Sequence, residues 1–200
     1  MNEMHLALHG VALKKHANAA AVAAAVGLDA ARAASLLKDA AAGARLVDAQ
    51  GAYALTPAGR MILDNQYARF YGELRADQGF VGAYERFERV NVELKQIVTD
   101  WQTLDVGGQK LRNDHSNADY DAEVLDRLGD LHERFEPILA QLVQGLPRLA
   151  VYREQLERAL EAAEAGRLEW VSDPKIASYH TVWFELHEDL LRVLGRAREE

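Results

Sequence analysis

The sequence contains no cysteine and only four prolines in 200 residues. Without cysteine, the chain has no disulfide bond, no thiolate zinc site and no cysteine nucleophile. The longest stretch without Lys, Arg, Asp, Glu or His runs from Ala17 to Leu28, which is too short to span a bilayer. The N-terminus also lacks the basic region and apolar core of a secretion signal. These absences favour a cytoplasmic protein and predict no membrane contact.

Positive charge is scarce, because 23 Lys and Arg face 31 Asp and Glu and leave a net charge of −8. This balance argues against a basic coat for nucleic acid over the whole chain. The charge is uneven: residues 1–64 hold six Lys/Arg and five Asp/Glu, a net of +1, so the remainder carries −9. We therefore expect two parts, a weakly basic domain over 1–64 and an acidic domain over 65–200.

The first part reads as three short helices near residues 3–15, 18–26 and 30–42. Asn18 and Asp29 are suited to cap the second and third helices, and Gly27-Leu28 forms the turn between them. A helix, a three-residue turn and a second helix are the spacing of a helix-turn-helix. The many alanines allow the two helices to cross closely.

A small β-hairpin is predicted next. Residues 45–49 and 52–55 read as strands, and Gln50-Gly51 between them suits a tight turn. Thr56-Pro57 then begins another helix, with Thr as the cap and Pro at its first position.

These segments resemble the winged-helix domain of MarR-like and related bacterial regulators. The resemblance is carried by Gly27-Leu28-Asp29, by Leu36-Leu37 and above all by the run Tyr53-Ala54-Leu55-Thr56-Pro57-Ala58-Gly59-Arg60, and it covers about residues 5–64. It implies a winged helix-turn-helix whose third helix enters the major groove of DNA. Winged helices also serve as protein-interaction modules, so the resemblance implies the fold more firmly than the function.

The third helix and its surroundings supply candidate DNA contacts. The third helix has polar residues at a spacing of three, namely Arg32, Ser35 and Lys38. Arg32 can donate two hydrogen bonds to a guanine. Ser35 can reach a base or a phosphate, and Lys38 suits a phosphate. The alternative is that these residues are ordinary solvated charges. The helix is poor in polar base readers, and the hairpin tip has no Arg or Lys for a minor groove. The complete predicted set is Lys14, Lys15, Arg32, Ser35, Lys38 and Arg45.

The second part reads as helix almost throughout, near 57–77, 81–102, 121–144, 147–165 and 178–198. Apolar residues at alternating spacings of four and three predict an all-α bundle. Pro137 should kink its helix. The last helix has so wide an apolar face that it belongs in the middle of a bundle or at a subunit interface. Residues 103–120 are polar and glycine-containing, and we interpret them as a disordered tether, with a lid as the alternative.

Polar and aromatic residues on the apolar helix faces are the candidates for a ligand site. If they converge, they form an apolar pocket with a few polar anchors, as small organic ligands require. The alternative is that they are packed core residues. The candidates are Tyr84, Asn91, Trp101, His132, Tyr179, His180, Trp183 and His187.

The amino-acid sequence contains no recognisable catalytic or metal-binding motif. No GxSxG, HExxH, Walker or GxGxxG run occurs, so we expect no enzyme and no cofactor. His5 and His9 have a chelating i, i+4 spacing, but no third ligand is implied. We interpret both as surface or half-buried histidines and expect no metal.

A second, fainter resemblance involves the segments Val98–Gln102 and Ser178–Leu190, which are similar to a helical tail in some actinobacterial proteins with phosphoenolpyruvate-utilising domains. The first interpretation of the whole chain is a homodimeric regulator that binds a palindromic operator in double-stranded DNA and responds to a small organic effector. The alternative is a non-enzymatic accessory protein of a phosphotransfer enzyme, with the winged helix as a protein-binding module.

Overall fold

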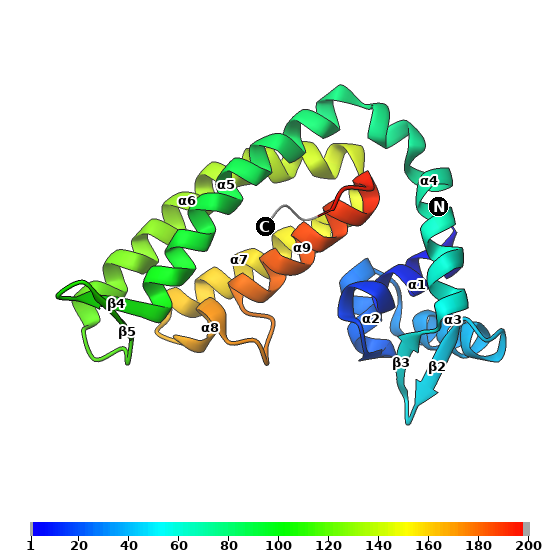
Figure 1. Ribbon diagram of the computed structural model, residues 1–200, viewed down its shortest axis with the longest axis horizontal. Helices are drawn as coiled ribbons and strands as arrows, with labels where there is room; N and C mark the ends of the chain where they lie inside the picture. The colour runs from blue at the N-terminus through cyan, green and yellow to red at the C-terminus, as the bar shows by residue number, and fades with distance from the viewer. Residues whose placement is uncertain (1, 198–200) are drawn as a thin grey trace. The chain divides into compact units, whose positions relative to one another are not determined.

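The computed structural model describes residues 2–197. Within them the chain is mainly α-helical, with two small antiparallel sheets (Figure 1). The chain divides into two compact units. The first comprises Met1–Gln78 and Glu185–Glu200, and the second comprises Gly79–Phe184. The N-terminal unit therefore includes a segment from the far end of the sequence.

The N-terminal unit follows the helix and hairpin order expected from the sequence and adds a two-residue strand, β1, that was not predicted. The elements are α1 (Glu3–Lys14), β1 (Ala17–Asn18), α2 (Ala19–Val26), α3 (Ala30–Ala42), β2 (Leu46–Ala49), β3 (Ala52–Leu55) and α4 (Pro57–Ala76).

The predicted helix caps are confirmed by side-chain hydrogen bonds. Asn18 Oδ1 accepts from the backbone N–H of Ala21, and Asp29 Oδ1 accepts from those of Ala31 and Arg32. Such bonds satisfy the unpaired donors of a first helical turn. Gly27 ends α2 in the left-handed conformation, with φ 70°. The axes of α2 and α3 are bent by 113° at this three-residue break.

The three strands form a sheet in the order β1-β3-β2, all antiparallel. The hairpin turn places Gln50 at φ 59° and Gly51 at φ 85°. Positive φ at both central residues makes a turn whose twist matches that of the flanking strands. The predicted hairpin is therefore confirmed.

The surroundings of Gly59 explain why the Thr-Pro-x-Gly run at the start of α4 ends in glycine. Thr56 caps the helix by accepting from the N–H of Gly59 at 2.9 Å, and its hydroxyl donates to the Ala44 carbonyl at 2.8 Å. A Cβ at Gly59 would lie only 2.0 Å from the Arg45 carbonyl oxygen. Glycine is therefore required because α4 begins in direct contact with the backbone that leads into the hairpin.

The second unit is built on long helices with a second hairpin between the first two. Its elements are α5 (Gln78–Gln102), β4 (Thr103–Val106), β5 (Gln109–Arg112), α6 (Ala118–Gly145), the 3₁₀ turn η1 (Pro147–Leu149), α7 (Ala150–Glu164), α8 (Glu169–Ser172) and the first part of α9 (Tyr179–Leu194).

Aromatic rings hold the core of the second unit. The Trp183 ring on α9 stacks on Phe87 of α5 at 5.1 Å between centroids and packs against Phe135 of α6 at 4.4 Å. All three residues are buried, as expected for apolar positions on the helices of a bundle. Pro137 lies inside α6, and the helix continues through it to Gly145.

Two expectations for this unit are wrong. Residues 103–120 are not a tether, because Thr103–Val106 pairs with Gln109–Arg112 in an antiparallel hairpin, so this part of the chain is not all-α. The last helix ends at Leu194, where Gly195 takes φ 66° and stops it. Residue 198, the predicted end, lies outside the described residues.

Among the described residues, no single helix has the length and apolarity to cross a membrane; α2 and α3 pass that test only as a pair, and they are bent by 113° where they meet.

Candidate functional site

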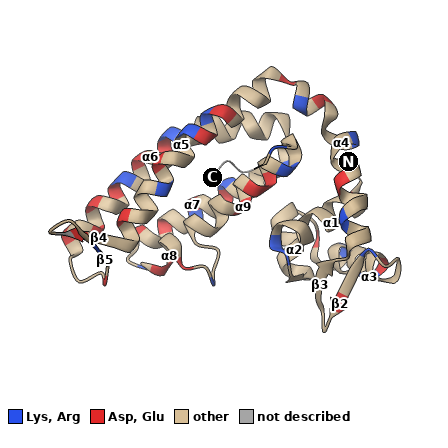
Figure 2. Ribbon diagram, in the orientation of Figure 1, with Lys and Arg blue, Asp and Glu red and all other residues tan. Residues whose placement is uncertain are grey.

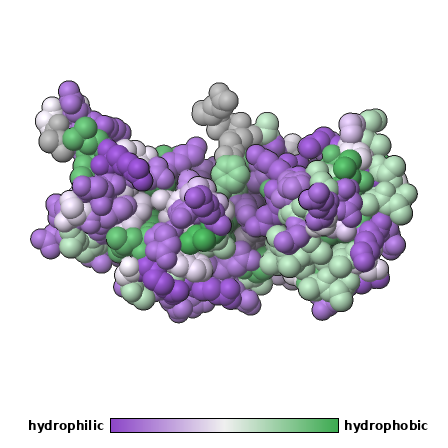
Figure 3. Space-filling model, turned by 90° about the horizontal axis from the view of Figure 1, so that it is seen from below, coloured by the Kyte–Doolittle hydropathy of each residue, from purple (hydrophilic) through white to green (hydrophobic). Residues whose placement is uncertain are grey.

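The predicted DNA-binding residues of α3 share its exposed face. Ala33, Leu36, Leu37 and Ala40 are buried and pack the helix onto its unit. Arg32, Ser35 and Lys38 are exposed, as their spacing predicts. Neighbouring surface on this unit carries broad patches of weakly hydrophobic residues, in keeping with its many alanines (Figure 3). The other exposed residues of α3 are Ala30, Ala31, Asp39 and Ala42, so Asp39 is the one further polar side chain exposed on this helix.

Two of the predicted basic contacts already have carboxylate partners. Arg32 binds Glu3 through Nη2 at 2.7 Å, with both side chains about half exposed. Exposed ion pairs contribute only about 0–1 kcal/mol, so this pair opens at little cost. Lys14 Nζ lies 2.5 Å from Glu185 Oε1, and both groups are largely shielded from solvent. Lys14 is therefore less available to a phosphate than the exposed Lys15 and Lys38.

His5 and His9 are completely buried, so the expectation of surface or half-buried histidines is wrong. His9 Nδ1 lies 2.6 Å from the Tyr67 hydroxyl, and its Nε2 lies 3.0 Å from Asp189 Oδ1. His5 Nε2 lies 3.2 Å from the Tyr71 hydroxyl. No group of three or more His, Asp or Glu suited to a metal occurs within residues 2–197. These histidines join α1 to α4 and to the last turns of α9.

The predicted ligand residues do not gather around one cavity. Asn91 and Trp183 bond to each other, because the indole N–H of Trp183 donates to Asn91 Oδ1 at 3.0 Å. His132 Nδ1 lies 3.1 Å from the Tyr179 hydroxyl. Burial, and secondarily the charge of Glu136, raises the pKa of Tyr179, so the phenol stays protonated. These four residues are packed in the core, which is the alternative given in the sequence analysis.

The remaining predicted residues are spread over both units. The Tyr84 hydroxyl donates to Glu88 on the same helix. His180 is half-buried, and burial lowers its pKa and favours the neutral ring. His187 is buried and belongs to the N-terminal unit. Of the eight candidates, only Trp101 lines the pocket described next.

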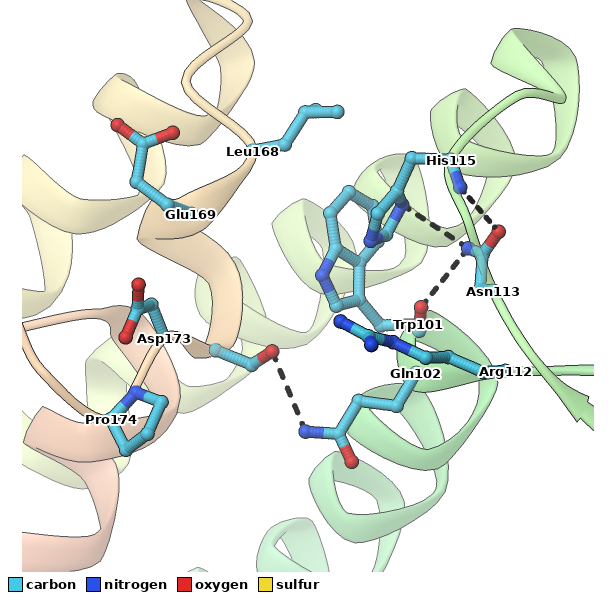
Figure 4. Close-up of a pocket in the computed structure, with 10 residues that line it drawn as sticks. Trp101, Gln102, Arg112, Asn113, His115, Leu168, Glu169, Asp173 and Pro174 are labelled. Carbon is cyan, nitrogen blue, oxygen red and sulfur yellow. Dashed lines mark hydrogen bonds between the residues drawn. The ribbon is translucent and has the colours of Figure 1, made fainter.

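A pocket of about 640 Å³ opens in the second unit between the end of α5, the β5 strand with its following loop, and α8 (Figure 4). Arg112 and His115 come from the hairpin side, and Glu169 and Asp173 come from the facing side. Gln102 Nε2 lies 3.5 Å from Ser172 Oγ, which links the two walls. The lining residues are Trp101, Gln102, Arg112, Asn113, His115, Leu168, Glu169, Ser172, Asp173 and Pro174.

His115 is held in this pocket by a buried carboxylate. Its Nδ1 lies 3.0 Å from Asp121 Oδ2, and Asp121 is only 4% exposed. Asn113 Nδ2 also donates to Asp121, at 2.8 Å. The His115 ring packs against Trp101 with centroids 4.6 Å apart. A carboxylate on Nδ1 fixes the tautomer and leaves Nε2 to interact with another group.

The backbone of His115 is in an unusual conformation, with φ 60°. Positive φ is uncommon for residues other than glycine and persists only when surrounding contacts enforce it. Here the backbone N–H of His115 donates to Asn113 Oδ1 at 3.0 Å while its ring is fixed by Asp121 and Trp101. The loop therefore holds His115 in an unfavourable backbone conformation that places its ring beside the pocket.

In the sequence, residues 103–120 read as one tether, and residues 113–117 within it have no assigned role. The missed signal was Gly107-Gly108, whose φ values of 63° and 82° make the same kind of hairpin turn as Gln50-Gly51. A hairpin there returns residues 113–117 to the end of α5, next to Trp101. The contribution of α8 had no comparable signal, because that helix is only four residues long.

Two polar groups of the pocket are available to a ligand. Nε2 of His115 has no hydrogen-bond partner in residues 2–197. Arg112 likewise forms no ion pair with any described carboxylate, so its charge is available to a ligand.

Comparison with the models of protein families, with curated proteins and with solved structures gave no match for this chain.

Proposed function

We propose that the protein is a transcriptional regulator whose N-terminal unit is a winged helix-turn-helix. The observation that carries the proposal is the pair α2 and α3, joined by Gly27-Leu28-Asp29 and bent by 113°. Helix-turn-helix pairs cross at about 90–120° and are joined by three or four residues that often include glycine. The hairpin β2–β3 follows α3, where the resemblance to MarR-like regulators places the wing.

The face that would meet DNA is the exposed side of α3. Arg32 and Ser35 lie in its first two turns, the part that reaches base edges in helix-turn-helix proteins, and Lys38 lies one turn further. Lys15, which follows α1, and Arg45, which lies between α3 and β2, would contact phosphates. The acidic second unit supports this assignment, because Asp and Glu are interspersed among the Lys and Arg of α5 and α6 (Figure 2).

A homodimer on a palindromic operator is part of the proposal. One α3 offers only three polar contacts with DNA, and two half-sites a helical turn apart multiply the affinity of such short contacts. The wide apolar face of α9 does not by itself argue for a dimer, since Tyr179, Leu186 and Leu190 are buried within the single chain.

The alternative, a non-enzymatic accessory protein, draws support from the paired state of Arg32 and Lys14. Both basic groups already contact carboxylates, and a protein-binding winged helix needs no free cations. The two functions predict opposite results with DNA, so one experiment separates them.

The experiment is selection of genomic DNA fragments by the full-length protein, followed by affinity measurement on the best fragment. If α3 reads bases, Arg32→Ala costs about 1–3 kcal/mol and relaxes one base position. Arg69→Ala on the exposed side of α4 is the control and leaves affinity within about twofold. The regulator proposal fails if no fragment is enriched, or if both variants bind like the unaltered protein.

A further inference from the structure

We propose that the pocket between β5 and α8 binds a small zwitterion, a molecule with a carboxylate or similar anion at one end and an ammonium group at the other. Under the proposed regulator function this molecule would be the effector. Binding itself does not depend on that function and can be measured without DNA.

The charges on the two walls are of opposite sign. Arg112 projects into the pocket from the hairpin side, while Asp173 and Glu169 stand on the facing side (Figure 4). Arg112 has no carboxylate partner in residues 2–197, and Asp173 is not neutralised by any basic side chain there. Walls of opposite charge that remain separated are complementary to a ligand that carries both charges.

The anionic end is assigned to Arg112 and His115. A guanidinium presents paired N–H donors that match a carboxylate, and hydrogen bonds between charged groups are about twice as strong as neutral ones. His115 adds a second group on the same wall, with Nε2 unpartnered because Asp121 occupies Nδ1. The strained backbone at His115 is accounted for if this placement serves recognition.

The cationic end is assigned to Asp173 and Glu169. Asp173 Oδ1 accepts from the backbone N–H of Lys175 at 2.8 Å, which orients its carboxylate and leaves the second oxygen for a ligand. Glu169 is exposed and can move to meet an ammonium group. Apolar contact comes from Trp101, Leu168 and Pro174, so the middle of the ligand is expected to carry carbon rather than further charge.

The test is isothermal titration calorimetry on the full-length protein without DNA. The twenty common amino acids, 4-aminobutyrate and taurine are first screened by thermal shift. The best binder is then compared with its N-acetyl derivative, which lacks the cation, and with its amide, which lacks the anion. We expect each blocked derivative to bind at least tenfold more weakly than the free zwitterion.

Variants localise the binding. Arg112→Gln and Asp173→Asn should each raise Kd about tenfold or more, since each removes one charged hydrogen bond. Lys110→Gln, on the same strand as Arg112 but outside this pocket, should leave Kd unchanged. Circular dichroism checks that all three variants remain folded.

The proposal is overturned if no zwitterion in the panel binds below about 10 mM, if a blocked derivative binds as well as its parent, or if Lys110→Gln weakens binding as much as Arg112→Gln. Each of these outcomes is distinct from failure of the regulator function, which would appear as absent DNA binding with zwitterion binding intact.

Discussion

At the scale of single residues, Asn91 is a buried polar group of the second unit whose side chain is paired inside the chain. Asn91 is 5% exposed, accepts from the Trp183 indole and donates to Glu88 Oε2 at 3.2 Å. A buried amide is costly unless it is bonded, and Asn91 meets this requirement by joining α5 to α9. The Asn91 side chain therefore has a structural role.

The first prediction is that Asn91→Leu destabilises the protein, although leucine suits an apolar seam. The change leaves the Trp183 N–H buried without its acceptor, which costs about 1–3 kcal/mol. Urea unfolding followed by tryptophan fluorescence measures the loss. Val92→Ala is the control, since Val92 is 67% exposed and should shift stability by less than about 0.5 kcal/mol. An Asn91→Leu protein as stable as the unaltered one would show that the bond to Trp183 contributes nothing.

The second prediction concerns pH and His180. Burial lowers the pKa of this ring below its ordinary value of 6.5, so the unfolded chain binds a proton more readily than the folded one. The contribution of His180 to stability is therefore fully present above pH 6.5 and is lost as the pH drops through that value toward the lower pKa of the folded state. His180→Gln removes this contribution, and its unfolding free energy should fall less between pH 7 and pH 5.

The same comparison with His16→Gln, at an exposed position, is the control for His180. Urea midpoints at three pH values suffice. Parallel pH profiles for the unaltered protein and His180→Gln would contradict the burial argument.

At the scale of elements, α4 begins in close contact with the backbone of Arg45. Most of its side chains beyond that point are exposed to solvent or only partly buried. Only Gly59, Leu63, Tyr67 and Tyr71 are buried, a strict spacing of four. Met61 and Ile62 remain 67% and 38% exposed. The helix thus depends on a narrow stripe and on the Thr56 cap for its position.

The third prediction sets two glycines of α4 against each other. Gly59→Ala would place a Cβ 2.0 Å from the Arg45 carbonyl oxygen, a backbone atom that cannot rotate away, so we expect a loss of about 3 kcal/mol or more. At Gly72 a Cβ meets nothing within 4 Å, so Gly72→Ala should stabilise by about 0.5–1 kcal/mol through helix propensity. Thermal unfolding measures both. Equal shifts of the same sign would refute the close approach of α4 to Arg45.

Elements near strong local signals were predictable from the sequence. The caps at Asn18, Asp29 and Thr56 place the starts of α2, α3 and α4 correctly, because capping is a local interaction. The second hairpin was missed because its strands are polar, and a polar, glycine-containing run was read as a tether. The pairing of β4 with β5 shows that a two-residue glycine turn was the stronger signal.

The candidate pocket was mostly beyond sequence reasoning. Trp101 was identified as an aromatic residue on a helix face, but its neighbours come from residues 112–115 and 168–174. The role of His115 depends on Asp121, which reads as an ordinary acidic residue at the start of a helix. The burial of His9 likewise depends on Asp189, 180 positions away. Contacts at such separations leave no periodic trace in the sequence.

At the scale of the whole molecule, α1 and α4 meet the second half of α9 in the N-terminal unit. Lys14 bonds to Glu185, and His9 bonds to Asp189. Arg75 bonds to the carbonyl of Val193. Arg75 Nε donates to the Val193 carbonyl at 2.7 Å and so closes the end of α9. The N-terminal unit is consequently expected to depend on the last segment of the chain for its stability.

The fourth prediction is that Asp189→Ala destabilises the N-terminal unit. Asp189 is fully buried against His9, and removal of one partner leaves the other buried without its bond, at a cost of about 1–3 kcal/mol. Glu73→Ala on α4 is the control, since Glu73 is exposed and such a surface substitution should shift stability by less than about 0.5 kcal/mol. Hydrogen exchange of α1 amides measures the effect. Equal protection of α1 in both variants would contradict it.

The salt dependence of DNA binding by the full-length protein shows whether α3 contacts phosphates. For a phosphate-contacting protein, log Kobs falls with log[salt] by about 0.9 per phosphate neutralised. The account predicts that Lys38→Ala lowers this slope by about one per protomer and weakens all sequences alike, whereas Lys95→Ala on α5, with the same loss of charge, leaves the slope unchanged. Identical slopes for Lys38→Ala and the unaltered protein would contradict the assignment of α3 as the DNA-binding face.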